Sequence, residues 1–121
     1  MSGSAETTAA ELTSRFRDKP LQFALGEKYA YSNSGYYLLG TIIERASGKP
    51  YAEFLQENIF APLGMKQTGY DNPVRIIKNR AAGYARTSDG FINAAPISMS
   101  TAYSAGALYS TVEDLLRWDQ A

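Results

Sequence analysis

The residues of this chain with the clearest capacity for chemistry are a tyrosine and an asparagine two positions apart, Tyr31 and Asn33. On an extended lead-in to a helix, such side chains project to the same side, which places a phenol beside a carboxamide. A helix N-terminus adds backbone N–H groups that favour anions. A phenol, with an ordinary pKa near 10, becomes a useful base only when cationic neighbours lower that value. A catalytic tyrosine of this kind therefore implies a nearby lysine.

The same triplet has a structural explanation that requires no chemistry. Tyr-x-Asn is short enough to occur by chance, and Asn33 or Ser34 serves equally well as the N-cap of the helix that follows. The triplet alone is a weak indication of function, so its surroundings have to decide.

Two absences from the composition restrict the chemistry further. The 121 residues contain no cysteine, which excludes disulfides, thiolate catalysis and cysteine-based metal sites. They contain no histidine either, which removes the usual general base at neutral pH, the Ser-His-Asp triad and most transition-metal sites. Hydrolysis would have to use Lys, Tyr, Asp or Glu. No metal and no cofactor is expected.

Charge and hydropathy exclude two further classes of partner. Lys plus Arg and Asp plus Glu both number 12, so nothing indicates an electrostatic hold on nucleic acid or anionic lipid. No apolar run approaches the roughly 20 residues that a membrane-spanning helix needs. Residues 1–4, Met-Ser-Gly-Ser, have neither a basic nor an apolar region, so we expect no signal peptide in this chain and interpret them as a cloning remnant.

The elements that must position Tyr31 and Asn33 are predicted to be helices. A capping box formed by Thr8 and Glu11 predicts a short helix over about residues 9–18. Leu12 and Phe16, four apart, define its expected buried side.

The strongest helix is predicted over about residues 35–46. Its broad apolar face comprises Leu38, Leu39, Ile42 and Ile43. Gly48 stands where the glycine after a helix belongs. A third helix over about residues 51–60 presents Phe54, Leu55 and Ile59 to the same core. The link between the two helices is short, so we expect them to pack as an antiparallel pair.

The second half of the chain is less regular. Residues 65–102 lack helical periodicity, and segments 82–86 and 91–94 are predicted to form a small hairpin around Ser88-Asp89-Gly90. A second capping box, Ser110 to Glu113, opens a last helix that carries Leu115, Leu116 and Trp118.

Longer motifs around the triplet resemble a known family. They are Pro20-Leu21-Gln22-Phe23, Gly26-Glu27-Lys28, Tyr31-Ser32-Asn33-Ser34-Gly35-Tyr36, Leu39-Gly40, Ile43-Glu44, Ser47-Gly48-Lys49, Pro62-Leu63-Gly64-Met65, Ser104-Ala105-Gly106-Ala107-Leu108-Tyr109-Ser110-Thr111 and Glu113-Asp114-Leu115. Together they resemble the class C β-lactamase, D-alanyl-D-alanine carboxypeptidase and family VIII esterase group of penicillin-binding-protein-like serine hydrolases. The resemblance covers nearly the whole chain.

The resemblance implies roles for three residues. Tyr31 would be the general base or proton relay to a nucleophilic serine. Asn33 would hydrogen-bond the catalytic lysine and the substrate amide or ester. Gly106 would line the pocket, although a plain turn glycine explains that residue equally well.

Two other motifs of that family are missing from this sequence. The family needs Ser-x-x-Lys, yet none of the five lysines has a hydroxyl residue three positions before it. The third motif, Lys-Thr-Gly or His-x-Gly, is also missing. Without the lysine, nothing obvious activates Tyr31, and Ser32 has no base to pair with it. The chain alone is therefore expected to be inactive.

The predicted fold is accordingly mainly α. Residues 5–121 would form one helical subdomain of the β-lactamase/transpeptidase-like fold, with a long irregular segment and a small β-hairpin, truncated at both ends relative to a longer parent enzyme. That parent would act through an acyl-serine on a β-lactam, a D-Ala-D-Ala peptide of the peptidoglycan type or a small ester. Related full-length enzymes are commonly exported to the periplasm or cell envelope, but this chain leaves the localisation open.

Two alternatives stay open at this point. The first is a free-standing module that keeps the helical fold and binds a partner or a cell-wall peptide through apolar surface. The face exposed by truncation would also favour self-association. The second is acid/base chemistry by carboxylates. Its candidates are Glu53 and Glu57 on a predicted helix and Asp71 and Asp89 in predicted loops.

Overall fold

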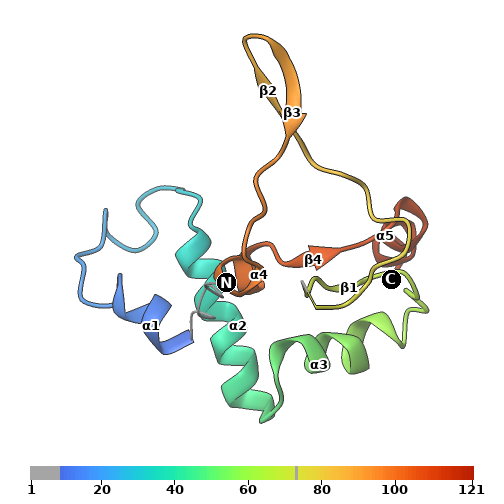
Figure 1. Cartoon of the computed structure of the whole chain (residues 1–121). Coiled ribbons are helices and arrows are strands. Elements are labelled where there is room, and N and C mark those ends of the chain that lie inside the picture. Colours follow the sequence, from blue (N-terminus) through green and yellow to red (C-terminus); the bar gives the residue numbers. More distant parts are fainter. Residues whose placement is uncertain (1–8, 73) are drawn as a thin grey trace.

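The computed structural model describes residues 9–72 and 74–121. Most of the regular structure is helical, as predicted (Figure 1). The helical elements are α1 (Ala9–Ser14), α2 (Asn33–Ser47), α3 (Tyr51–Leu55), the π-helical turn η1 (Gln56–Phe60), α4 (Met99–Ala102), the 3-10 turn η2 (Tyr103–Ala105) and α5 (Val112–Asp119). The expected cloning remnant at residues 1–4 and the capping residue Thr8 lie outside the described residues.

Helix α1 is shorter than predicted. It ends at Ser14, whose hydroxyl donates to the carbonyl of Glu11 at 2.7 Å, and residues 15–18 continue as turns. A serine hydroxyl that bonds to a nearby carbonyl competes with the helical pattern, which accounts for the early end. Leu12 is buried and Phe16 is partly buried, as the spacing predicted.

Helix α2 begins at Asn33, two residues before the predicted start at about residue 35. The N-cap is Ser32, which has extended backbone and accepts the Gly35 N–H through its hydroxyl at 3.2 Å. The prediction of Asn33 or Ser34 as cap was therefore wrong, because Asn33 already has helical conformation. The predicted end is confirmed: Gly48 has a φ of 71° and donates its N–H to the carbonyl of Glu44 at 2.9 Å.

The apolar stripe of α2 is mostly not in the core. Leu39 and Ile42 are 53% and 58% exposed, whereas the buried residues of the helix are Tyr37 and Gly40. The hydrophobic core packs against the face of α2 that carries Tyr37 and Gly40. Of the four residues in the predicted apolar stripe, Ile43 packs against this core. The buried face was mispredicted because the small residue Gly40 lies where other elements approach.

Helices α2 and α3 are not an antiparallel pair. Figure 1 shows α3 running away sideways from the end of α2. The start of α3 is held by Glu44 of α2, whose carboxylate accepts the Tyr51 N–H at 2.8 Å. Helix α3 passes directly into η1, so the helical stretch ends at Phe60, as predicted.

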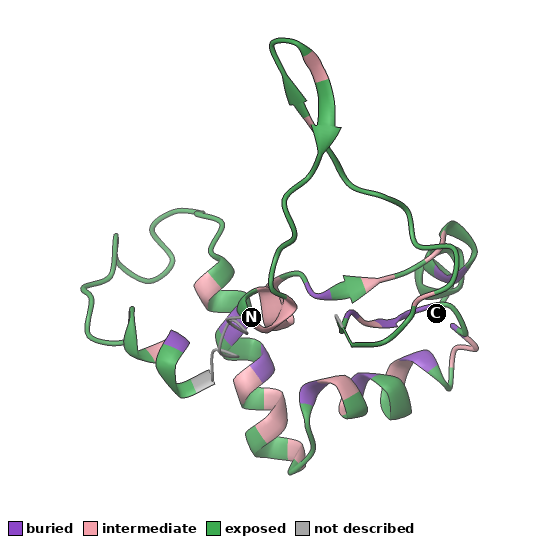
Figure 2. Ribbon diagram, viewed as in Figure 1, coloured by how far each residue is buried: buried purple, intermediate pink, exposed green. Residues whose placement is uncertain are grey.

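The core lies between α3, η1 and the short strands β1 (Gly69–Tyr70) and β4 (Leu108–Tyr109), where buried residues gather in Figure 2. Its buried members are Tyr51, Leu55, Phe60 and Met65. The two strands pair antiparallel, with Gly69 opposite Tyr109. This pairing was not predicted, because its partners lie about 40 positions apart in the sequence.

Strands β2 (Tyr84–Thr87) and β3 (Gly90–Asn93) form the predicted hairpin. They pair antiparallel with Thr87 opposite Gly90, and Gly90 has a φ of 123°. The hairpin extends away from the helices at the end of an arm (Figures 1 and 2), and most of its residues are exposed.

Helix α5 is capped by Thr111, whose hydroxyl accepts the Asp114 N–H at 3.3 Å. The predicted capping box began one residue too early, at Ser110. None of the helices in the described part of the chain is both long enough and apolar enough to cross a membrane.

Candidate functional site

The cap of α2 places the Tyr-x-Asn triplet. Ser32 has extended backbone with a φ of −141°, so the side chains of Tyr31 and Asn33 flank an extended residue at the start of a helix. Tyr31 is 63% exposed, and its ring lies 5.6 Å from that of Tyr36 between centroids. The phenol therefore stands at the surface beside the N-terminus of α2.

Asn33 lines a cavity of about 250 Å³ between α1 and the start of α2. Thr101 and Ala105, from the segment before Gly106, line the same cavity. Two cationic side chains, Arg15 and Lys19, line it as well, so the cavity favours an anionic or strongly polar group. Tyr31 is not among the described residues that line it.

Gly106 directly follows η2. Its φ is 166°, which is extended backbone open to any residue, and a Cβ added there would meet no atom within 4 Å. Neither a strained turn nor a close packing contact demands glycine at this position. Gly106 instead faces open space, and it directly follows Ala105, which lines the cavity.

The segment that carries Gly106 is tied to α2 by contacts that the sequence analysis missed. The Ser104 hydroxyl donates to the carbonyls of Tyr36 and Tyr37, at 2.9 and 3.3 Å. A Cβ added to Gly40 would lie 2.2 Å from the Ser104 hydroxyl oxygen. A glycine within an apolar helix costs stability relative to alanine, so Gly40 was a usable sign of close approach.

Tyr103 has two unfavourable features just before Ser104. Its φ is 40°, a backbone conformation that residues other than glycine rarely adopt. Its hydroxyl is buried and makes no hydrogen bond of normal geometry within residues 9–72 and 74–121, although the Glu44 carboxylate lies near it. Burial, and then the nearby Glu44 carboxylate, raise the pKa of Tyr103 well above its ordinary value. The ring is held in place by Tyr37 and Tyr51, at 4.7 and 5.2 Å between centroids.

Replacing Tyr103 with phenylalanine is expected to leave the free energy of unfolding within about 1 kcal/mol of its original value, because the ring is kept and the buried hydroxyl makes no hydrogen bond of normal geometry. Chemical denaturation of both proteins measures the difference. Tyr84→Phe, at a position 65% exposed on the hairpin, is the matched control and should leave stability unchanged. A clear loss of stability in Tyr103→Phe would show that the hydroxyl has a partner after all.

A buried carboxylate holds α5 against the core. Asp114 is fully buried, and its carboxylate accepts the Gln67 N–H at 2.7 Å and the Thr68 hydroxyl at 2.8 Å. Arg117 forms an ion pair with the same carboxylate. Burial by itself raises the pKa of Asp114, but the hydrogen bonds from Thr68, Gln67 and Arg117 outweigh it and hold the pKa below its usual range.

The side chains of α5 are thus arranged in an unusual way. Leu115, Leu116 and Trp118 are 53%, 56% and 54% exposed, while Asp114 is the buried residue of the helix. An amphipathic surface helix normally buries its apolar face. This helix presents its apolar face outward.

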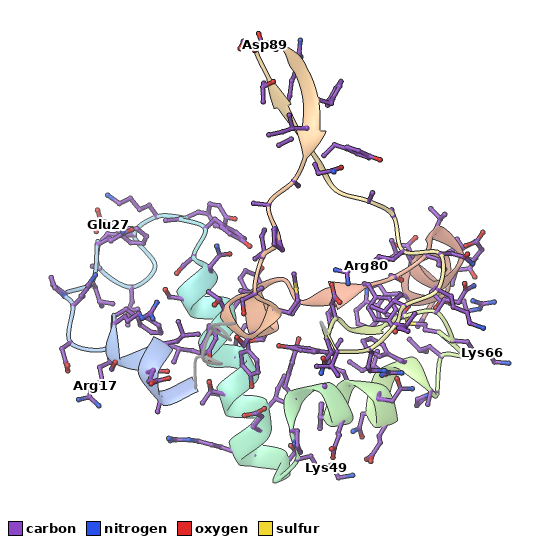
Figure 3. The ribbon with its side chains drawn as sticks, viewed as in Figure 1. Arg17, Glu27, Lys49, Lys66, Arg80 and Asp89 are labelled. Carbon is purple, nitrogen blue, oxygen red and sulfur yellow. The ribbon has the colours of Figure 1, made fainter. Side chains whose placement is uncertain are left out.

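Of the carboxylates of the acid/base hypothesis, Glu53 and Glu57 line one cavity together, and the other two candidates are not among the described residues that line it. Glu57 pairs with Lys49, and Asp71 pairs with Arg80. Asp89 lies at the tip of the hairpin, far from Lys49 in the link between α2 and α3 (Figure 3). Within the described part of the chain, no three acidic side chains come together as a metal site would require.

The comparison with known families decides the relationship. A family model described as Beta-lactamase matches residues 2–121. This chain belongs to the β-lactamase family. The resemblance seen in the motifs is confirmed.

Individual members of the β-lactamase family agree with this assignment. The mouse serine beta-lactamase-like protein LACTB, mitochondrial, is 36% identical over 107 residues, which cover 88% of this chain and 19% of that protein. The D-alanyl-D-alanine-carboxypeptidase/endopeptidase AmpH of Escherichia coli (strain K12) is 36% identical over 102 residues, covering 83% of this chain and 24% of that protein. The chain thus spans about a fifth to a quarter of these curated relatives.

A solved member shows the same fold. The D-amino acid amidase from Ochrobactrum anthropi SV3, in complex with L-phenylalanine amide, superposes with a TM-score of 0.80 at 34% identity, over 96% of this chain and 34% of that one. The chain therefore has part of the β-lactamase/transpeptidase-like fold and is related to serine hydrolases of the penicillin-binding-protein type.

Proposed function

We propose that this chain is the helical subdomain of a longer serine hydrolase and carries the Tyr-x-Asn part of its active site. In that enzyme Tyr31 relays a proton, Asn33 holds the catalytic lysine and the substrate amide, and Gly106 lines the pocket. The observation that carries the proposal is the position of Asn33 in the first turn of α2, where it lines one cavity together with Ala105.

The reaction of the longer enzyme is acyl transfer to a serine that this chain does not contain. The serine oxygen forms an ester with the substrate carbonyl, the C–N or C–O bond to the leaving group breaks, and a proton passes through the lysine and Tyr31 to that leaving group. Water then hydrolyses the ester and restores the serine. The names of the relatives, a D-alanyl-D-alanine-carboxypeptidase and a D-amino acid amidase, favour amide bonds next to D-amino acids as the substrate class.

Exposed apolar surface supports the idea of a subdomain. Leu39 and Ile42 on α2, and Leu115 and Trp118 on α5, are each about half exposed. Apolar patches of this kind mark contact surfaces. The remaining lobe of the enzyme would cover them, with residues 5–121 as one unit within the larger fold.

The purified chain should form no acyl-enzyme with a fluorescent penicillin and should not hydrolyse a nitrophenyl ester above the buffer rate. The reason is that Ser-x-x-Lys is missing from the sequence, so no serine has an activating lysine one turn away. Gel fluorescence and intact mass spectrometry measure the labelling. The positive control is the longer protein encoded in the same reading frame.

The same experiment separates the alternative of a free-standing binding module, which the exposed apolar surface also favours. An upstream Ser-x-x-Lys in the reading frame and labelling of the longer protein support the hydrolase. A natural start just before residue 5, with no such motif, supports the module. Stoichiometric acylation of one serine in the purified 121-residue chain would contradict the proposed inactivity.

A further inference from the structure

The closest approach between two elements near the candidate site lies where η2 crosses α2. Gly40 is buried, and a Cβ added there would lie 2.2 and 2.5 Å from Oγ and Cβ of Ser104 and 2.7 Å from a ring carbon of Tyr103. Contacts below 3.0 Å with backbone-near atoms cannot be relieved by a small side-chain movement. Only glycine at position 40 permits this spacing.

Hydrogen bonds fix the position of η2 along α2 as well as its distance. The Ser104 hydroxyl bonds to two successive carbonyls of the helix, those of Tyr36 and Tyr37. Both carbonyls lie one turn after Asn33. A shift of η2 along the helix by one residue would break both bonds.

The contact between η2 and α2 is accompanied by an unfavourable backbone conformation at Tyr103. Tyr103 is held at a φ of 40° directly before Ser104, and the Tyr37 and Tyr51 rings pack against it. Such backbone strain persists only where the surroundings hold it in place, and it concentrates at functional sites. The strain lies two residues before Ala105, which lines the cavity with Asn33.

We propose that Ser104 and Gly40 are positioning residues that set the spacing between Asn33 and the segment leading to Gly106, and hence the width of the substrate pocket. The inference rests on the proposed function only in treating this cavity as a substrate pocket. The spacing itself is a property of this chain and can be measured without any activity.

The first test uses the 121-residue chain. Gly40→Ala should displace η2 and shift the amide resonances of Asn33 and Gly106 in ¹H–¹⁵N spectra. The double variant Gly40→Ala with Ser104→Gly removes two of the three close contacts, but it also removes the two hydrogen bonds and leaves the contact with the Tyr103 ring. It should therefore shift these resonances less than Gly40→Ala does. Gly35→Ala on the same helix is the matched control, since its Cβ would meet only ordinary contacts from 3.7 Å.

Ser104→Ala keeps the proposal testable if Gly40→Ala fails to fold. It introduces no clash and removes only the two hydrogen bonds, so it should shift the same two resonances by less. Unchanged Asn33 and Gly106 resonances in a folded Gly40→Ala chain, or in Ser104→Ala, overturn the proposal.

The second test uses the longer hydrolase from the same reading frame. Gly40→Ala should lower kcat by roughly 10- to 100-fold while the protein remains folded, because misplacement by about 1 Å costs that much in a positioned site. Adding Ser104→Gly should recover only part of the loss, because it relieves the close contact with Ser104 and removes the two hydrogen bonds of its hydroxyl. If the unaltered longer protein has no activity, the proposed function fails, and the spectra of the short chain still decide the positioning role.

Discussion

Replacing Asp114 with asparagine is expected to lower the midpoint of thermal unfolding by on the order of 10 °C. The carboxylate receives three donors, from Gln67, Thr68 and Arg117. An asparagine side chain has one acceptor oxygen, and its NH₂ group would face a donor in a buried site. A buried donor left without an acceptor is costly, so the attachment of α5 to the core should weaken.

The loss should depend on pH in a defined direction. The folded state holds the pKa of Asp114 below its usual range, so its stabilisation is fully present above the unfolded value near 3.9 and disappears as the pH falls through the lower folded pKa. The difference between the original chain and Asp114→Asn should therefore be constant near neutrality and shrink below about pH 4.

Circular dichroism melts between neutral pH and about pH 3 measure both effects. Glu113→Gln removes a charge from the exposed neighbouring position of the same helix and is the matched control. It should change the midpoint by no more than about 2 °C, since exposed charges contribute little. An Asp114→Asn melt that coincides with that of the control would show that the buried carboxylate does not stabilise the fold.

The largest effects on activity are expected from Tyr31→Phe and Asn33→Ala in the longer hydrolase. Each should lower kcat/KM by roughly 10²- to 10⁴-fold, which is the usual contribution of a positioned proton-transfer group. Tyr31→Phe removes only the hydroxyl from a side chain that is 63% exposed, so the fold should be retained.

Tyr36→Phe is the matched control for this pair of variants. Its ring lies beside that of Tyr31 and its side chain is also exposed, but its hydroxyl has no role in the proposed relay. Steady-state kinetics and the rate of labelling by a fluorescent penicillin measure the changes. If Tyr31→Phe acylates as fast as Tyr36→Phe, the assignment of Tyr31 as proton relay is wrong.

The parts of the fold that follow from local signals could be predicted from the sequence. Gly48 ends α2 because a left-handed residue is needed there, and Ser88-Asp89-Gly90 turns the hairpin because Gly90 supplies a positive φ. Both signals act over a few residues. The helix end and the turn are therefore determined locally and do not depend on how distant segments pack.

Contacts between distant segments could not be predicted. The pairing of β1 with β4 and the burial of Asp114 against Thr68 join positions more than 35 residues apart. Periodicity gave α2 a buried stripe that includes Leu39 and Ile42, but both are exposed because η2 and α3 pack on another face. An apolar side chain in a helix is expected to be buried against something, but the sequence does not indicate which segment or partner buries it.

The candidate site divides in the same way. Tyr31 and Asn33 came from family resemblance, and their roles remain predictions. Ser104 was missed because its hydrogen bond reaches a carbonyl 68 positions away. The glycine opposite it, Gly40, was visible as an anomaly in the middle of a helix, and a glycine in that position indicates that another segment of the chain approaches closely.

The projecting hairpin is closed at its base, where the Ala94 N–H donates to the carbonyl of Gly83 at 2.9 Å. Because this bond already closes the base, residues added or removed at the tip between Thr87 and Gly90 change only the size of a closed ring. Each doubling of such a ring costs only about 0.6 kcal/mol. The tip is thus a place where relatives can gain or lose length during divergence while the helices keep their geometry.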